Sequence, residues 1–125
     1  MFSEKEIKYI QSQPLGRLAT VSKDGQPDVV PVAFEYDDKH FYIGGFIIKK
    51  TRKFWNVKKG NSKVSFVIDD LASVKPWKAR GIKITGTAEI VEVDGESGKD
   101  LNIRITPQAS QSWGIDGKWS AKAHK

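Results

Sequence analysis

Apolar and polar residues alternate along most of this chain, a pattern typical of β-strands that bury one face. The alternation predicts six strands, over residues 15–22, 28–36, 40–44, 63–69, 80–93 and 101–105. Turn-forming residues such as Asp24-Gly25 separate the strands, as expected for hairpins. Pro31 cannot donate to a strand ladder, so its strand belongs at an edge, a bulge or a ligand-facing stretch.

Other glycines and prolines predict where the longer strands bend or end. Gly86 indicates a bend or bulge within residues 80–93. We expect Pro107 to end the last strand, and the aromatic segment 113–119 reads as irregular.

Two short segments show helical signals instead. Ser3 and Glu6 have the spacing of a capping box, and Pro14 predicts that this first helix ends at about Gln13. Residues 51–59 predict a second helix ended by Gly60. With strands in a meander and no βαβ rhythm, we expect a mainly β fold: an antiparallel barrel of six or more strands with two short helices, forming one domain over residues 1–125.

Composition narrows the partners and the chemistry. The chain has 21 basic and 15 acidic residues, a net charge of +6, which favours anionic partners although a solvated basic surface would give the same count. Because there is no cysteine, disulfides and thiolate chemistry are excluded. The sequence has no apolar run long enough to span a membrane, and its N-terminus does not resemble a signal peptide. We therefore predict a cytoplasmic protein that does not associate with a membrane.

The most informative stretch surrounds the predicted start of the second helix. Thr51 is a candidate N-cap, and Lys49, Lys50, Arg52 and Lys53 crowd beside it. Cations are unfavourable at a helix N-terminus by about 0.3–1 kcal/mol each. A bound phosphate would reverse that effect, because helix N–H groups and cationic side chains would converge on it. The alternative is a solvated basic turn.

The order of several motifs resembles a known family. The relevant segments are 15–21 (LGRLATV), 24–27 (DGQP), 29–32 (VVPV), 41–44 (FYIG), 51–53 (TRK), 64–70 (VSFVIDD), 75–77 (KPW), 80–86 (RGIKITG) and 112–116 (SWGID). Together they are similar to the pyridoxamine 5′-phosphate oxidase-like split barrels that bind FMN. The later segments resemble the deazaflavin-dependent branch, which uses coenzyme F-420.

This resemblance implies a homodimer with two cofactor sites at the subunit interface. It also implies the cofactor-binding residues, while the catalytic residues stay unknown. By the resemblance, a strand beside the cofactor ring holds Val30, Pro31 and Val32, and a neighbouring strand holds Tyr42, Ile43 and Gly44. The phosphate turn holds Thr51, Arg52 and Lys53, with Lys50 beside it as a further cofactor-binding residue. A segment reaching in from the second subunit holds Arg80 and Gly81.

The resemblance implies a redox enzyme in which a flavin or deazaflavin reduces a small unsaturated substrate. Members that oxidise pyridoxamine phosphate carry basic residues on the second strand, where this chain has Val30 and Glu35, and a C-terminal substrate motif that is missing here. We therefore expect no true pyridoxamine phosphate oxidase activity. A deazaflavin brings a long acidic tail that Lys49 and Lys50 would suit, but FMN also carries a phosphate, so both cofactors stay open.

Two other classes of function remain as alternatives. The chain could carry or sense a cofactor without turnover, or it could be a basic barrel that binds single-stranded nucleic acid. We expect no metal site, because His40 and His124 are the only histidines and His124 lies in a segment predicted to fray. Trp77 and Trp113 are candidates either for packing or for the wall of a ligand pocket.

Overall fold

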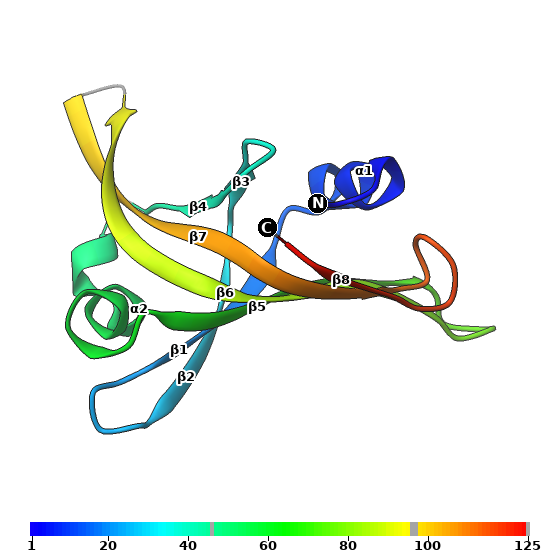
Figure 1. Cartoon of the computed structure of the whole chain (residues 1–125), viewed down its shortest axis with the longest axis horizontal. Coiled ribbons are helices and arrows are strands. Elements are labelled where there is room, and N and C mark those ends of the chain that lie inside the picture. Colours follow the sequence, from blue (N-terminus) through cyan, green and yellow to red (C-terminus); the bar gives the residue numbers. More distant parts are fainter. Residues whose placement is uncertain (46, 96–97, 125) are drawn as a thin grey trace.

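The computed structural model describes residues 1–45, 47–95 and 98–124, and its strands form one curved sheet with short helices at its ends (Figure 1). In chain order the elements are α1 (Glu4–Ser12), β1 (Gly16–Val21), β2 (Pro27–Val32), β3 (Glu35–Tyr36), β4 (Phe41–Ile43), the 3₁₀ turn η1 (Ile48–Lys50), α2 (Arg52–Trp55), the π-helical turn η2 (Asn56–Gly60), β5 (Lys63–Ser73), β6 (Lys78–Gly95), β7 (Gly98–Trp113) and β8 (Ser120–Ala123).

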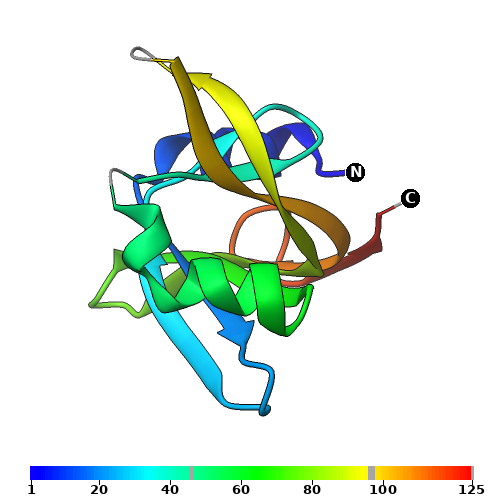
Figure 2. The ribbon, with the colours of Figure 1, turned by 90° about the vertical axis from the view of Figure 1, so that its left-hand side faces the viewer.

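The sheet confirms the predicted fold class. Its strands follow the order β2-β1-β5-β6-β7-β4-β3, with β8 added against β7, and every pairing is antiparallel. The long β6–β7 hairpin curves round from one end of the molecule to the other, so the sheet folds over on itself (Figures 1 and 2). The two α-helices and the eight strands match a split barrel of six or more strands.

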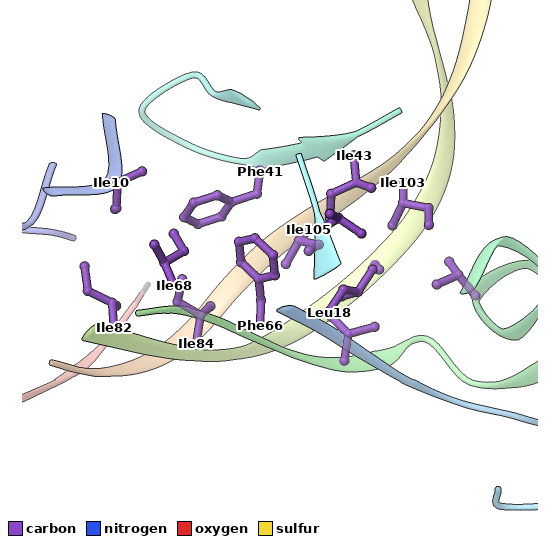
Figure 3. Close-up of a cluster of buried hydrophobic side chains, with 14 of the residues drawn as sticks. Ile10, Leu18, Phe41, Ile43, Phe66, Ile68, Ile82, Ile84, Ile103 and Ile105 are labelled. Atoms are coloured by element: carbon purple, nitrogen blue, oxygen red, sulfur yellow. The ribbon is translucent and has the colours of Figure 1, made fainter. Parts of the chain in front are cut away.

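The barrel interior is filled by the apolar positions that alternate along the strands. Val64, Phe66 and Ile68 on β5 are buried, as their spacing predicted. Phe66 packs against Phe41 with ring centroids 5.4 Å apart, in the middle of isoleucines from β4, β6 and β7 (Figure 3). Burying such side chains is the main term that holds the sheet closed, at about 1.5–3 kcal/mol each.

The first helix has the predicted cap. The Ser3 hydroxyl accepts a hydrogen bond from the Glu6 N–H at 3.2 Å, and the Glu6 carboxylate accepts one from the Ser3 N–H at 2.9 Å. The helix ends at Ser12, and Gln13 is extended before Pro14. The second helix also begins and ends close to its predicted bounds, but its last turn is π-helical.

The predicted strand 28–36 is wrong as a single element. Its first part, β2, ends at Val32 and pairs with β1, whereas Glu35 and Tyr36 form β3 and pair with β4. Between them Phe34 turns toward the core and meets the Phe66 ring at 5.4 Å. Because a period-two pattern does not record which neighbour a strand takes, the crossover at residues 33–34 was not visible in the sequence.

The prediction that Pro107 ends the last strand is also wrong. Strand β7 continues to Trp113, and the pairing of β6 with β7 shifts register where Gly86 lies opposite Pro107. The extra residue of this bulge is Gln108, whose carbonyl oxygen accepts a hydrogen bond from the His124 N–H at 2.7 Å. A bulge lets a strand accommodate a residue that cannot donate to the ladder. The predicted bend at Gly86 is confirmed.

The C-terminal segment is more ordered than predicted. Residues 114–119 are irregular, but β8 then pairs with β7, and His124 is not frayed. The His124 ring lies 4.6 Å from the ring of the buried Phe2, and its Nε2 is 2.7 Å from the Ser110 hydroxyl. These contacts join the two ends of the chain.

Candidate functional site

The basic turn at the start of α2 is the most highly charged part of the chain. Residues 48–60 contain six lysines and arginines and no acidic residue. Lys49, Lys50 and Arg52 are exposed, and Lys53 is half-buried. Among the described residues, no ion pair within 4.0 Å includes any of these four side chains. The turn therefore concentrates positive charge that the described part of the chain does not neutralise.

Thr51 occupies the N-cap position of α2, but its side chain does not cap the helix. Its hydroxyl instead donates to the Ile48 carbonyl oxygen at 2.6 Å and closes the preceding 3₁₀ turn. The prediction that Thr51 is the N-cap residue is therefore confirmed for its position, although its hydroxyl forms no capping hydrogen bond. The first N–H groups of a helix have no intrahelical acceptor, so without a side-chain cap they are available to an external anion.

Lys53 is half-buried, whereas Lys49, Lys50 and Arg52 are exposed. Burial lowers the pKa of its ammonium group below the ordinary value, and the nearby Asp28 carboxylate on β2 partly opposes that shift. A half-buried ammonium gains when an anion replaces the water it has lost. Lys53 is thus the side chain of the turn with most to gain from a bound phosphate.

Strand β2 lies beside the basic turn. Helix α2 contacts both β1 and β2, and the two views show it against their hairpin (Figures 1 and 2). Within β2, Val30 is half-buried, Pro31 is exposed and Val32 is buried. The strand is an edge of the sheet, as its proline predicted. The structure therefore brings the predicted ring strand and the predicted phosphate turn together.

The end of β4 contributes to an open groove on the other side of the turn. Ile43 is fully buried in the core and faces away from this groove, whereas Tyr42 is half-buried opposite Arg104 of β7. Gly44 faces the Asn102 side chain so closely that a Cβ there would lie 3.1 Å from its Oδ1 atom. The groove has a volume of about 650 Å³. Its lining comprises Gly44, Gly45, Ile47, Ile48, Lys49, Lys50, Lys99, Asp100, Leu101 and Asn102.

Arg80 and Gly81 lie at the opposite end of the molecule, near the β5–β6 hairpin (Figure 1). The Arg80 guanidinium donates to both carboxylate oxygens of Asp70, at 3.0 and 2.6 Å. The Tyr9 hydroxyl also donates to Asp70, at 2.8 Å, and the guanidinium lies 5.0 Å from the centre of the Tyr9 ring. Within one chain these two residues do not meet the basic turn.

This cluster shifts the pKa values of its members in opposite directions. The Arg80 guanidinium, assisted by the Tyr9 hydroxyl, holds the pKa of the Asp70 carboxyl below its ordinary value. Burial, together with the bond to Asp70, raises the pKa of Tyr9. At neutral pH the cluster therefore holds a carboxylate, a guanidinium and a neutral phenol, and Arg80 is fixed in direction.

Gly81 has a packing role that the sequence did not reveal. A Cβ at this position would lie 2.4 Å from the Cζ2 atom of Trp113, so the absent side chain lets the indole lie on the backbone of β6. Lys99 and Asn102 were also missed, because they reach the groove only through the pairing of β4 with β7. No spacing rule in the sequence connects these residues with Lys49 and Lys50.

Comparison with known proteins identifies the family of this chain. The sequence profile of the pyridoxamine 5′-phosphate oxidase family matches residues 3–121. The chain belongs to this family. It is also 40% identical, over 98% of its length and 90% of the relative, to a 5a,11a-dehydrotetracycline/5a,11a-dehydrooxytetracycline reductase from Streptomyces rimosus. These two matches support an oxidoreductase.

Solved structures of the family share the fold. A candidate pyridoxamine 5′-phosphate oxidase from Corynebacterium glutamicum is 26% identical, with a TM-score of 0.67 over 89% of this chain and 88% of that one. The heme storage protein HutZ from Vibrio cholerae has a TM-score of 0.65 over 86% and 91% of the two chains, and at 20% identity this likeness shows the fold alone. Proteins that share this fold are thus named for different ligands.

Among the described residues, no helix is long and apolar enough to cross a membrane. Nor do their histidine and acidic side chains form a group of three or more that could hold a metal ion.

Proposed function

We propose that this chain is a flavin- or deazaflavin-dependent reductase whose cofactor phosphate is held by the basic turn of α2. The observation that carries this proposal is the positive charge of Lys50, Arg52 and Lys53 beside the edge strand β2, without a described ion-pair partner. A phosphate there would satisfy the cations and the free helix N–H groups together.

The residues present fit such a cofactor. Arg52 and Lys53 would hold the phosphate, and the backbone of residues 30–32 would lie along the ring, with β4 beside it. Once bound, the cofactor would supply hydride, while the protein holds it in place and excludes water. Because Thr51 already donates to Ile48, its hydroxyl would contribute only as an acceptor or after rotating.

The groove beside the turn favours coenzyme F-420 over FMN. Its lining carries Lys49, Lys50 and Lys99 against one acidic residue, Asp100, and does not include Arg52 or Lys53. FMN ends at its phosphate, whereas the acidic tail of the deazaflavin would continue into this cationic groove.

A second copy of the chain would complete the site. Arg80 and Gly81 lie at the end of the molecule remote from the basic turn, so they reach a cofactor only if it belongs to a partner subunit. The edge strand β2, with Val29 65% exposed, also leaves an apolar surface that a partner would cover. We therefore propose a homodimer with two interfacial sites.

The relative's name indicates the class of substrate. A 5a,11a-dehydro compound carries a carbon–carbon double bond that its reductase saturates, with hydride added to one carbon and a proton to the other. At 40% identity over almost the whole chain, we propose the same type of acceptor here, a polycyclic molecule with an activated double bond.

A cofactor titration tests the proposal. The purified chain should bind FMN or F-420, and Arg52→Ala with Lys53→Ala should weaken that binding at least about 100-fold, since charge-assisted bonds contribute about 1.5–3 kcal/mol each. The matched control is Lys58→Ala with Lys59→Ala. It removes the same charge from the same helix, but these two ammonium groups lie over the Trp55 ring.

Further arms of this titration separate the alternatives. F-420 with a longer acidic tail should bind more tightly, and Lys49→Ala with Lys99→Ala should abolish that gain while leaving FMN binding unchanged, because these two groove lysines lie outside the proposed phosphate turn. Heme is the negative comparison, and preferential binding of heme would contradict the proposal. A bound, reduced cofactor that passes hydride to no acceptor in stopped-flow measurements would indicate a carrier. Failure to bind either flavin, or equal losses in the control, would refute the phosphate turn.

A further inference from the structure

A second hollow lies on the outer face of the sheet, next to the β5–β6 hairpin. It has a volume of about 460 Å³. Trp77, Leu71, Ala79 and Trp113 supply its apolar wall. Its polar rim consists of two pairs of charged residues, Arg17 with Asp69 and Arg80 with Asp70. We call it the tryptophan cleft. It lies at the same end of the molecule as Arg80 and Gly81, away from the basic turn.

The floor of the tryptophan cleft is the Trp113 indole, which packs against Gly81. Gly81 pairs with Trp113 across β6 and β7, and the indole lies over the bare Gly81 backbone because no Cβ stands in its way. Asp69 pairs with Gly81 from the other side, so these three positions form one row across the sheet. An aromatic plane laid on a sheet accepts a flat partner by stacking.

Trp77 stands at the mouth of the cleft with most of its surface in water. Its side chain is 69% exposed, and Leu71 is 41% exposed. None of the aromatic ring pairs found among the described residues includes Trp77. The exposed Trp77 indole can cover a ligand that packs on Trp113. Covering the ligand would remove apolar surface of both the indole and the ligand from water.

The polar rim can offer both a donor and an acceptor. The Arg17 Nε and Asp69 Oδ1 atoms are 3.6 Å apart, and the two side chains are 41% and 46% exposed. This pair is looser than the bidentate Arg80–Asp70 pair on the neighbouring side, whose closest distance is 2.6 Å. An exposed pair at that distance contributes little to stability, so both charged groups can turn toward a ligand at small cost.

We propose that the tryptophan cleft binds the hydride acceptor, and that this acceptor is a flat, fused-ring molecule with polar groups of both kinds along its edge. The inference rests on the proposed function, which puts this end of one chain beside the cofactor of its partner. Stacking on Trp113 and Trp77 would hold the ring plane, and Arg17 with Asp69 would hold the polar edge. The rim carries two positive and two negative charges, which suits a ligand bearing both charges and disfavours a simple anion.

Tetracycline is a suitable probe for this cleft, because it is flat, polar-edged and needs no cofactor for a binding measurement. Quenching of tryptophan fluorescence would report its affinity for the cofactor-free protein. Trp77→Ala should raise the dissociation constant at least about tenfold, whereas Trp77→Phe should stay within about threefold, because it keeps a stacking ring. The matched control is Trp119→Ala, which removes an exposed indole that does not line the cleft.

Two further measurements make the result decisive. FMN or F-420 affinity should be unchanged in Trp77→Ala, so a failed cleft is distinguishable from a failed cofactor site. Wild-type affinity for tetracycline in Trp77→Ala, an equal loss in Trp119→Ala, or no binding by the wild type would overturn the inference. Gel filtration of each variant adds the last test: if Trp77→Ala turns a dimer into a monomer, the cleft is a subunit contact and the proposal is wrong.

Discussion

Glu6 joins the two ends of this fold and allows a quantitative test of what holds them together. Its side chain is fully buried, yet it belongs to the first helix of the chain. Its carboxylate accepts hydrogen bonds from the Ser3 N–H and from the Lys122 ammonium on β8. Although burial raises the pKa of Glu6, these bonds outweigh it and hold the pKa below the ordinary value of 4.5.

The change Glu6→Gln removes the charge and keeps the shape. The amide oxygen can still accept from Ser3, so the loss is the charge-assisted bond to Lys122, which contributes about 1.5–3 kcal/mol. The Lys122 side chain is 25% exposed, and water can partly replace the lost partner. We therefore expect about 2 kcal/mol of destabilisation, which corresponds to about 8 °C in Tm for a chain of this size.

Urea unfolding at pH 7 and a fixed protein concentration would measure this loss. The control is Asp94→Asn, which breaks the ion pair with Lys99 on the β6–β7 hairpin. Those side chains are 90% and 62% exposed, so the control should cost less than about 0.5 kcal/mol. In a double-mutant cycle, Lys122→Met should recover part of the cost of Glu6→Gln, because it removes the uncompensated ammonium.

The pH dependence has a definite sign. Because the folded pKa of Glu6 is lowered, its contribution is complete above the unfolded pKa of about 4.3 and disappears as pH falls through the folded value. The difference in the free energy of unfolding between wild type and Glu6→Gln should therefore disappear as the pH falls. If Glu6→Gln costs no more than Asp94→Asn at pH 7, this account of the carboxylate is refuted.

Two more predictions follow from the same region of the sheet. Gly86→Ala should destabilise the protein by about 1–3 kcal/mol, because its Cβ would lie 2.2 Å from the Thr106 carbonyl oxygen at the bulge. Thermal unfolding would measure this loss, with Thr85→Ala at an exposed neighbouring position as the control. Equal stability of the two variants would contradict the prediction. Burial lowers the pKa of His124, so wild-type stability should fall as pH drops below 6.5. Urea unfolding at pH 7 and pH 5 should show a smaller loss of stability for His124→Gln than for the wild type. An equal loss in the two proteins would show that His124 is not its cause.

The local signals in the sequence were sufficient for most elements. The capping box at Ser3 and Glu6 and the alternation through Phe66 depend only on neighbouring residues, and each is present as predicted. The concentration of cations around Lys50 and Lys53 is likewise a local fact. Short-range hydrogen bonds and the period of two along a strand are encoded within a few residues, so a single sequence contains them.

What the sequence could not determine is which segments become neighbours. The change of partner at residues 33–34, the continuation of β7 through Pro107 and the contact of Phe2 with His124 all depend on pairing across the sheet. So does the packing of Trp113 on Gly81, which creates the tryptophan cleft.

By itself, then, the sequence determined a mainly β chain with a cationic turn, because strand period, caps and charge are properties of adjacent residues. Only the tertiary structure decided that this turn lies beside β2 while Arg80 lies at the far end. The physical reason is that register and strand order are selected by the closing of one shared core, to which residues distant along the chain contribute together.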